Sequence, residues 1–297
     1  MRIGITGNTQ KESLWKPVED IAGRLVAAGR TLVLHPDILE VLERDGNPGI
    51  PTDDLVHVSS AQEFVEASEI ILSFGGDGTL LNTARMVGDR GVPILGINYG
   101  RLGFLANVDA SDLEMALRRI EQGDFGIDER LVLEARVDDE SPRWALNDVT
   151  LQRSGDTGLM TIHVEVDGRP LNTYWADGLI VSTPTGSTAY SLALGGPIMA
   201  PGCGSLLITP IAPHTLTVRP IVLPDTSRIR LWVSGQRRRY VVTVDGEPSL
   251  YENESVTIHV AKASHTVRLI RFEDQDYFST LRDKLMWGAR FQSVKHS

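Results

Sequence analysis

The sequence predicts a Rossmann-like α/β domain followed by an all-β sandwich domain, with a C-terminal helix that packs back on the first domain. Over residues 1–125, short apolar runs alternate with helical patterns, as in an open parallel sheet covered by helices. After Gly126 the pattern changes to short strands divided by Asp-Gly, Gly and Pro positions, which is typical of an antiparallel sandwich. The stretch from Tyr277 to Met286 is helical again.

These changes of pattern set the predicted domain boundaries. We expect the α/β domain over residues 1–125, the β-sandwich over 126–272 and the returning helical segment over 273–297. A chain of 297 residues is long enough for two domains of about 100–200 residues each.

Local signals support the individual elements. A helical pattern from Trp15 to Val26 ends near Gly29, a typical C-terminal cap. The strand patterns of the first half are Ile3 to Thr6, Thr31 to His35, Val56 to Val58, Ile70 to Phe74 and Val92 to Ile97. Those of the second half are Leu131 to Val137, Trp144 to Leu151, Thr161 to Val166, Leu179 to Ser182, Ile229 to Val233, Tyr240 to Val244, Val256 to His259 and Val267 to Ile270. Asp167-Gly168 and Asp245-Gly246 predict hairpin turns.

Composition limits the classes of function. The net charge of −10 argues against a nucleic-acid partner, which would require a basic face. The single cysteine, Cys203, permits no intrachain disulfide and fits the reducing cytoplasm. No apolar run approaches the ~18 residues of a membrane span, and the N-terminus lacks a signal-peptide pattern. We therefore expect a cytoplasmic protein with no membrane partner.

The most informative segment is the glycine-rich turn Gly75-Gly76-Asp77-Gly78-Thr79, which follows an apolar strand and precedes a helical pattern. Glycines let backbone N–H groups approach a phosphate, and a helix N-terminus favours negative charge. Asp77 would repel that phosphate, so it needs another role: holding Mg²⁺ between phosphates, or accepting a proton from an attacking hydroxyl. A tight turn with an aspartate cap is the structural alternative, but the whole pattern favours kinase chemistry.

Two segments of the second half are candidate binding sites. In Asp177 to Pro197 a strand runs into a turn rich in Ser, Thr and Gly, and Tyr190 offers a flat ring face. Such a composition also occurs for backbone reasons alone, so both interpretations stay open. Asn147-Asp148 interrupts an apolar strand pattern, so one side chain faces inward or sits at an irregularity. Ligand binding and a simple strand end both explain that pair.

Several other chemistries lack their motifs. The sequence contains no Cys-x-x-Cys or His-Glu-x-x-His metal pattern, no Gly-x-Ser-x-Gly turn and no Gly-x-x-x-x-Gly-Lys-[Ser/Thr] loop. These absences argue against a zinc site, a serine hydrolase and a P-loop phosphotransferase.

Taken together, the segments resemble the NAD kinase (ATP-NAD kinase) family, whose motifs they follow in order over most of the chain. The matches are Gly75 to Thr79, Gly96-Ile97-Asn98, Leu102-Gly103-Phe104-Leu105, Asn147-Asp148, Asp177 to Gly196, Pro213-His214-Thr215-Leu216 and Arg219-Pro220. The glycine turn is shared with diacylglycerol kinases, sphingosine kinases and, loosely, phosphofructokinases. The segment from Asp177 to Leu192 is far more specific to NAD kinases. The resemblance implies phosphoryl transfer from ATP to the 2′-hydroxyl of the adenosine ribose of NAD, giving NADP. It also implies a homo-oligomer, a dimer or a tetramer.

The resemblance assigns roles residue by residue. Asp77 matches the family's proposed general base and, by the same resemblance, would contact NAD. The ATP phosphates would bind at Gly75, Gly76, Gly78 and Thr79. The NAD-binding positions would be Asp77, Gly78, Asn147, Asp148, Asp177, Thr188, Ala189, Tyr190, Ser191, Leu192 and Ala193. Mg²⁺ or another divalent cation is expected, held mainly through the substrate phosphates with no dedicated protein cage.

Three positions depart from the family pattern. Asp148 replaces a longer Glu, Glu247 stands where an uncharged amide is common, and Trp175 stands where many relatives carry Arg. Without that arginine, a cationic contact is missing, which bears on how the nicotinamide half is bound.

Two rival functions use the same features. A lipid kinase of the diacylglycerol type would share the glycine turn, but the acidic balance and the lack of a basic amphipathic helix weigh against it. A non-catalytic dinucleotide-binding module would be expected to lack the carboxylate that Asp77 supplies.

Overall fold

The computed structural model describes residues 1–9, 15–44, 55–99, 103–106, 108–155, 159–274 and 276–287. Leu102 of the Leu102-Gly103-Phe104-Leu105 motif lies outside the described residues. The chain forms two compact units. Unit 1 contains residues 1–86, 92–128 and 269–297, and unit 2 contains residues 87–91 and 129–268.

Unit 1 is an α/β unit built on a parallel sheet. Its strands are β1 (Arg2–Gly7), β2 (Thr31–Leu34), β3 (Leu55–Val56), β4 (Ile70–Phe74), β5 (Ile94–Asn98) and β6 (Val108–Asp109). Its helices are α1 (Trp15–Ala27), α2 (Pro36–Arg44), α3 (Ala61–Ala67), α4 (Asp77–Val87, whose last residue belongs to unit 2), α5 (Leu113–Gln122) and α7 (Tyr277–Leu285). The strand order is β3-β2-β1-β4-β5, and Leu269, near the end of β16, pairs with Ile94.

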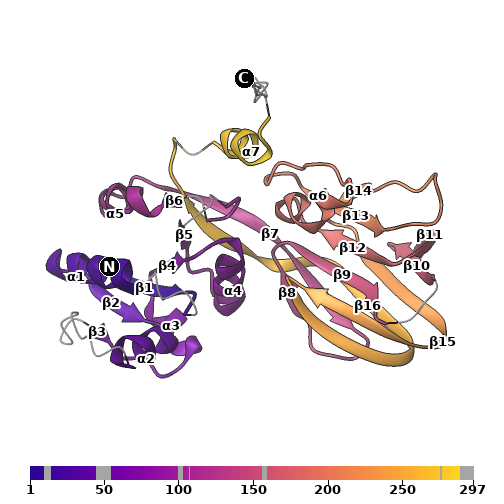
Figure 1. Ribbon diagram of the computed structural model, residues 1–297, viewed down its shortest axis with the longest axis horizontal. Helices are drawn as coiled ribbons and strands as arrows, with labels where there is room; N and C mark the ends of the chain where they lie inside the picture. The colour runs from indigo at the N-terminus through magenta and orange to yellow at the C-terminus, as the bar shows by residue number, and fades with distance from the viewer. Residues whose placement is uncertain are drawn as a thin grey trace, which may run out of the picture. The chain divides into compact units, whose positions relative to one another are not determined.

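Helices cover both faces of this sheet (Figure 1). Ile3 and Ile5 of β1 point into an apolar cluster that includes residues of α1 and α5. Between them, Gly4 faces α3, where an added Cβ would collide with the side chain of Ser68. Every residue of β4 and β5 is buried, as expected for central strands of a parallel sheet. The carboxyl end of β4 is therefore rigidly placed.

Unit 2 is an antiparallel β-sandwich. Its strands are β7 (Gly126–Val137), β8 (Arg143–Ala145), β9 (Asp148–Arg153), β10 (Met160–Val166), β11 (Arg169–Ala176), β12 (Gly178–Ser182), β13 (Ser205–Ile211), β14 (Ile221–Pro224), β15 (Ile229–Val244) and β16 (Glu247–Arg271). The first residues of β7 and the last residues of β16 belong to unit 1. A short helix, α6 (Tyr190–Ala193), follows a 3₁₀ turn over Thr185–Thr188.

Two long strands, β15 and β16, join the layers of the sandwich (Figure 1). The first part of β15 pairs with β10, through Val233 and Ile162, and its last part pairs with β9, through Val242 and Leu151. A register irregularity between Ser234 and Arg238 separates the two parts. Alternate residues of these strands fill one apolar core. The sequence predicted each long strand as two short ones because polar residues interrupt their apolar patterns.

The structure corrects the strand predicted from Trp144 to Leu151. It is divided into β8 and β9 by a bend at Leu146 and Asn147. The sequence pattern concealed this bend because Leu146 is apolar and buried in spite of its irregular backbone. The predicted helix over Tyr277 to Met286 corresponds to α7, which begins at Tyr277 and is capped by Asp276.

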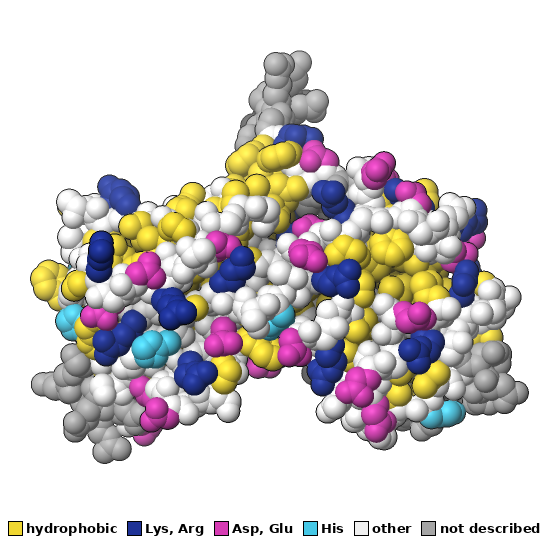
Figure 2. All heavy atoms as spheres, turned by 180° about the vertical axis from the view of Figure 1, so that it is seen from behind, with side chains coloured by type: hydrophobic (Ala, Val, Ile, Leu, Met, Phe, Trp, Pro, Cys, Tyr) yellow, Lys and Arg dark blue, Asp and Glu magenta, His cyan; other side chains and the backbone are white. Residues whose placement is uncertain are grey.

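Basic and acidic side chains are interspersed over the face shown in Figure 2. Within the described part of the chain, no helix is long and apolar enough to cross a membrane.

Candidate active site

The glycine turn of unit 1 links the buried strand β4 to helix α4. Gly75 donates its N–H to the carbonyl of Ile97 at 2.8 Å and has a φ of +155°. An added Cβ on Gly75 would collide with the side chain of Thr79, whereas Gly76 and Gly78 face open space. The carbonyl of Gly76 accepts the N–H groups of Thr79 and Leu80 at 3.0 and 3.1 Å. The turn therefore presents an open helix N-terminus, which suits a phosphate.

Asp77, the first residue of α4, is held by the main chain of a distant loop. Its Oδ1 accepts the N–H groups of Leu105 and Ala106, both at 3.0 Å, and its Oδ2 accepts the N–H of Phe104 at 2.9 Å. Each carboxylate oxygen offers about two acceptor positions, so Oδ2 retains one for a further donor. The carboxylate is therefore oriented but can still accept a hydroxyl proton.

Gly103 allows this arrangement. A Cβ at Gly103 would overlap Oδ1 of Asp77, and the Gly103 N–H donates to the carbonyl of Ala106 at 3.1 Å. The glycine of the Leu102-Gly103-Phe104-Leu105 motif thus leaves room for the Asp77 carboxylate.

In unit 2, the bend that carries Asn147 and Asp148 is held from two sides. On one side, Asp245 accepts the N–H groups of Leu146, Asn147 and Asp148 at 2.6, 2.8 and 3.1 Å. On the other, Thr183 donates its N–H to the Asn147 carbonyl at 2.9 Å and its hydroxyl to the Leu146 carbonyl at 2.5 Å. The bend therefore has a fixed backbone geometry.

The two side chains of this pair differ in exposure. Asp148 is only 8% exposed, while Asn147 is partly open to solvent. Burial, followed by the negative charge of Asp245, raises the pKa of Asp148 to about 6, and a hydrogen bond from the Thr150 hydroxyl opposes the shift. The prediction that one of the pair faces inward is confirmed, and the bend supplies the irregularity as well.

The hydroxyl-rich turn after β12 uses many of its hydroxyls to hold itself together. Ser187 and Ser191 are both fully buried. The Ser187 hydroxyl donates to the carbonyl of Pro184 at 2.7 Å, and the Ser191 hydroxyl bonds to the hydroxyl of Thr209 at 2.7 Å. Both hydroxyls are used inside the protein, which supports the backbone explanation at these positions. Gly186 packs against the Asn147 carbonyl, where a Cβ would collide.

The accessible part of the turn is its end. Tyr190 is 41% exposed, and its hydroxyl accepts a hydrogen bond from Gln152 at 3.3 Å. Ala193 is also exposed, whereas Thr188, Ala189 and Leu192 are partly buried. The surface at the end of the turn is therefore formed by the tyrosine ring and small apolar side chains.

Asp177 has a cationic partner that the sequence analysis missed. Its carboxylate accepts a hydrogen bond from Nε of Arg153 at 2.8 Å, and its carbonyl accepts the Arg153 N–H at 3.1 Å. Trp175, at the position where the resemblance leads us to expect arginine, is 55% exposed on β11. The positive charge beside Asp177 therefore comes from Arg153 at the end of β9.

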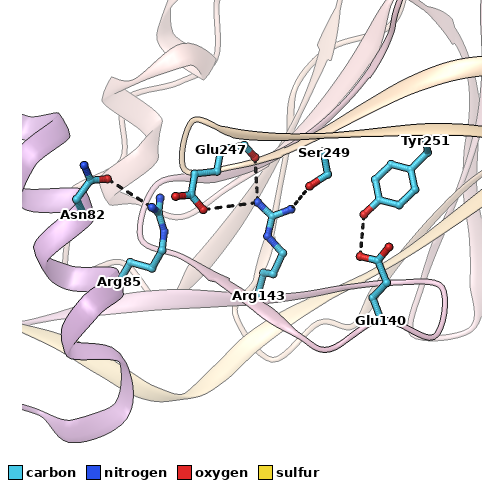
Figure 3. A network of polar contacts seen from close by, with 7 residues as sticks. All are labelled: Asn82, Arg85, Glu140, Arg143, Glu247, Ser249 and Tyr251. Atoms are coloured by element: carbon cyan, nitrogen blue, oxygen red, sulfur yellow. Dashed lines mark hydrogen bonds and ion pairs between the residues drawn. The ribbon is translucent and has the colours of Figure 1, made fainter. Parts of the chain in front are cut away.

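Glu247 belongs to a polar network on the hairpin between β15 and β16 (Figure 3). Arg143 of β8 donates to the carbonyl of Glu247 at 2.9 Å and to the hydroxyl of Ser249 at 2.8 Å, and the Glu247 carboxylate lies 4.0 Å from the same guanidinium. Tyr251 donates to Glu140 nearby at 2.8 Å. Glu247 thus helps to anchor the hairpin.

Among the residues that the structure describes, no group of three or more His, Cys, Asp and Glu side chains could hold a metal ion. In unit 1, a buried strand ends in an open glycine turn, and a carboxylate is fixed at the start of the following helix. This is the arrangement expected of a phosphotransferase that acts on a hydroxyl.

The comparisons with known proteins identify the family. The model of the ATP-NAD kinase N-terminal domain matches residues 3–125, and that of the ATP-NAD kinase C-terminal domain matches residues 146–272. The chain belongs to the ATP-NAD kinase family and is a phosphotransferase of that family.

Individual relatives agree with this assignment. The chain is similar to NAD kinase of Flavobacterium johnsoniae, with 37% identity over 97% of this chain and 98% of the relative. It is 44% identical to NAD kinase of Heliobacterium modesticaldum over 83% of this chain and 90% of that protein. Among solved structures, yeast NADH kinase complexed with NADH matches with a TM-score of 0.90 and 26% identity, over 99% of this chain and 90% of that chain.

Sequence reasoning did not anticipate the surroundings of Arg153, Asp245 and Asn98. Arg153 and Asp245 act through partners far away in sequence, so no local pattern marks their roles. Asn98, at the carboxyl end of β5, has a buried side-chain nitrogen with no hydrogen-bond partner among the described residues. A buried donor without a partner is costly, and its place in Gly96-Ile97-Asn98 was the only signal in the sequence.

Proposed function

We propose that this protein transfers the γ-phosphoryl group of ATP to the 2′-hydroxyl of the adenosine ribose of NAD, giving NADP and ADP. The observation that carries this proposal is the carboxylate of Asp77, which three main-chain N–H groups orient beside the open positions of Gly76 and Gly78. Such a carboxylate is suited to accept a proton at a phosphate-binding turn. The choice of ATP and NAD as substrates rests on membership of the ATP-NAD kinase family.

The chemical step follows from this arrangement. Asp77 accepts the proton of the 2′-hydroxyl through Oδ2 as the ribose oxygen forms a bond to the γ-phosphorus. The bond between that phosphorus and the β–γ bridging oxygen breaks, and ADP leaves. Gly75, Gly76, Gly78 and Thr79 are assigned to the phosphates, where the N–H groups of the turn and the Thr79 hydroxyl would stabilise the developing charge.

The β-sandwich supplies the proposed contacts to NAD. Asn147 and Asp148 are assigned to the adenosine, and Tyr190 stacks on a ring with Thr188 and Ala189 beside it. Asp177, paired with Arg153, shapes the nicotinamide side. The other proposed contacts are Ser191, Leu192 and Ala193, of which Ser191 acts through its backbone because its hydroxyl is buried.

A divalent cation, Mg²⁺ by preference, is proposed as the cofactor. We expect the ion to be held mainly by the substrate phosphates, because the Asp77 carboxylate is already bound to main-chain N–H groups. When bound, such an ion neutralises charge on the transferred phosphoryl group.

The experiment is an acceptor and donor profile of the purified protein. With ATP and Mg²⁺, NAD should be converted to NADP, which an NADP-specific dehydrogenase detects. Parallel reactions with NADH, inorganic polyphosphate, diacylglycerol and fructose 6-phosphate define the specificity. Phosphorylation of the lipid or the sugar phosphate, without NADP formation, would contradict the proposal.

We also propose that the protein works in the cytoplasm as a homo-oligomer, a dimer or a tetramer. The family resemblance supports the assembly, and the single cysteine fits the compartment. Sedimentation equilibrium at micromolar concentration would test the assembly, and a purely monomeric distribution would oppose it.

A further inference from the structure

Asp245 has more hydrogen bonds than its hairpin requires. Asp245 and Gly246 form the two-residue turn between β15 and β16, with φ angles of +46° and +83°, as favoured in tight hairpins. The turn itself needs only these backbone angles. The Asp245 carboxylate nevertheless accepts three main-chain N–H groups from the bend over Leu146 to Asp148.

Comparable aspartates in the same unit show the difference. Asp167, in the Asp167-Gly168 hairpin, has a φ of +51°, and its carboxylate accepts the N–H of Arg228 at 2.8 Å. Asp138 has a φ of +44° and accepts the N–H of Thr257 at 2.9 Å. Each of these carboxylates ties its turn to one neighbouring residue. Asp245 instead organises three consecutive N–H groups of the bend that carries two proposed NAD-binding residues.

Further hydrogen bonds hold the Asp245 turn in place. Its own N–H donates to the Asp148 carbonyl at 3.1 Å, so the turn and the bend bond in both directions. Arg143 holds the following residues through the Glu247 carbonyl and the Ser249 hydroxyl (Figure 3). A carboxylate on a fixed turn can impose a geometry on the segment that it contacts, as supporting residues do around binding sites.

We infer that Asp245 is a positioning residue for NAD, which sets the backbone of Leu146 to Asp148 so that the Asn147 amide and the Asp148 carboxyl meet the adenosine in one orientation. This inference rests on the proposed role of Asn147 and Asp148. Asp245 acts through the bend and needs no contact with NAD.

Two variants test the inference by degrees. Asp245→Asn can keep the two bonds of Oδ1 but turns an NH₂ group toward the Leu146 N–H. Asp245→Gly removes all three bonds, while glycine suits the positive φ of the turn. The KM for NAD should rise about 10-fold in Asp245→Asn, as expected for a lost charge-assisted bond, and further in Asp245→Gly. The KM for ATP should stay within about twofold of the wild-type value in both variants.

The matched control is Asp167→Asn, which alters a similar aspartate in a similar hairpin. It should leave both KM values unchanged. A merely structural role for Asp245 would lower kcat through loss of active protein and leave the KM for NAD at its wild-type value. That outcome, or an equal rise in the KM for ATP, would overturn the inference.

A further variant separates this inference from the function on which it rests. Asn147→Ala removes the proposed adenosine contact directly and should raise the KM for NAD. If Asn147→Ala has no effect, the proposed binding role of the bend fails and the inference fails with it. If Asn147→Ala raises the KM for NAD and neither Asp245 variant does, the binding role stands and only the inference about Asp245 is overturned.

Discussion

Asp77 and Asp148 show how the environment sets the chemistry of a carboxylate. Asp77 lies half-buried at the start of α4 with three N–H donors around it. Asp148 is buried beside another carboxylate, that of Asp245, and its pKa is raised to about 6. The first arrangement orients a hydrogen-bond acceptor, whereas the second disfavours the charged form of Asp148.

For Asp77 we predict that substitution by Asn lowers kcat by roughly 10²–10⁴-fold, the usual range for a general base. Asn has nearly the same shape, so NAD binding, measured by calorimetry, should be largely kept. Turnover equal to that of the wild type would exclude Asp77 as the proton acceptor.

For Asp148 we predict a pH-dependent gain in stability on substitution by Asn. Its pKa is raised in the folded protein, so its contribution to stability is full below pH ~4 and is lost as the pH rises through about 6. Asp148→Asn, which cannot ionise, should therefore be more stable than the wild type at pH 8, by up to about 3 kcal/mol. Denaturant unfolding at pH 4.5 and pH 8 measures the difference, and an equal effect at both values would contradict the electrostatic cause.

The ring of Tyr190 supports a third prediction at this scale. It is exposed, so Tyr190→Ala should fold normally and bind NAD more weakly, by about 1–2 kcal/mol if the ring stacks on the ligand. Calorimetric titration with NAD provides the measurement, and an unaltered affinity would remove this turn from the binding site.

At the scale of elements, the glycine turn and the loop over residues 103–106 depend on each other. The turn places Asp77 at the first position of α4, and the loop supplies the N–H groups that orient its carboxylate. The loop can approach because Gly103 has no side chain.

Gly103→Ala should therefore displace the Asp77 carboxylate and lower kcat by about 10²-fold, as expected for a misplacement near 1 Å. The control is Gly23→Ala in α1, where an added Cβ meets open space. That variant should keep full activity and gain about 0.5–1 kcal/mol of stability. Steady-state kinetics and thermal unfolding of both proteins decide the point, and full activity of Gly103→Ala would refute the dependence.

At the scale of the whole molecule, the chain passes through unit 2 and returns to complete unit 1. Ile270 and Phe272, which follow the last residues of unit 2, are 2% and 3% exposed in the core of unit 1. Residues from both ends of the sequence thus share one apolar core.

Ile270→Ala should accordingly destabilise unit 1 by about 2–5 kcal/mol, the usual range for a truncated core side chain. Met115→Ala, at a position of α5 that is 54% exposed, should change the stability by less than about 0.5 kcal/mol. Urea unfolding monitored by circular dichroism compares the two. Equal stabilities would show that the returning segment contributes little to unit 1.

The sequence by itself determined the fold class, the glycine turn, the two Asp-Gly hairpins and the inward position of one residue of the Asn147-Asp148 pair. Each of these follows from signals that lie within a few residues: hydrophobic periodicity, glycine and Asp-Gly positions typical of turns, and a polar pair inside an apolar run.

Only the tertiary structure decided which groups meet. The donors to Asp77 lie 27 to 29 residues away in sequence, those to Asp245 lie 97 to 99 residues away, and the bond from Arg153 to Asp177 spans 24 residues. The pairing and register of the strands bring these partners together, and a one-residue change of register would separate them. Local sequence patterns carry no such information, because a hydrogen bond depends on distance in space.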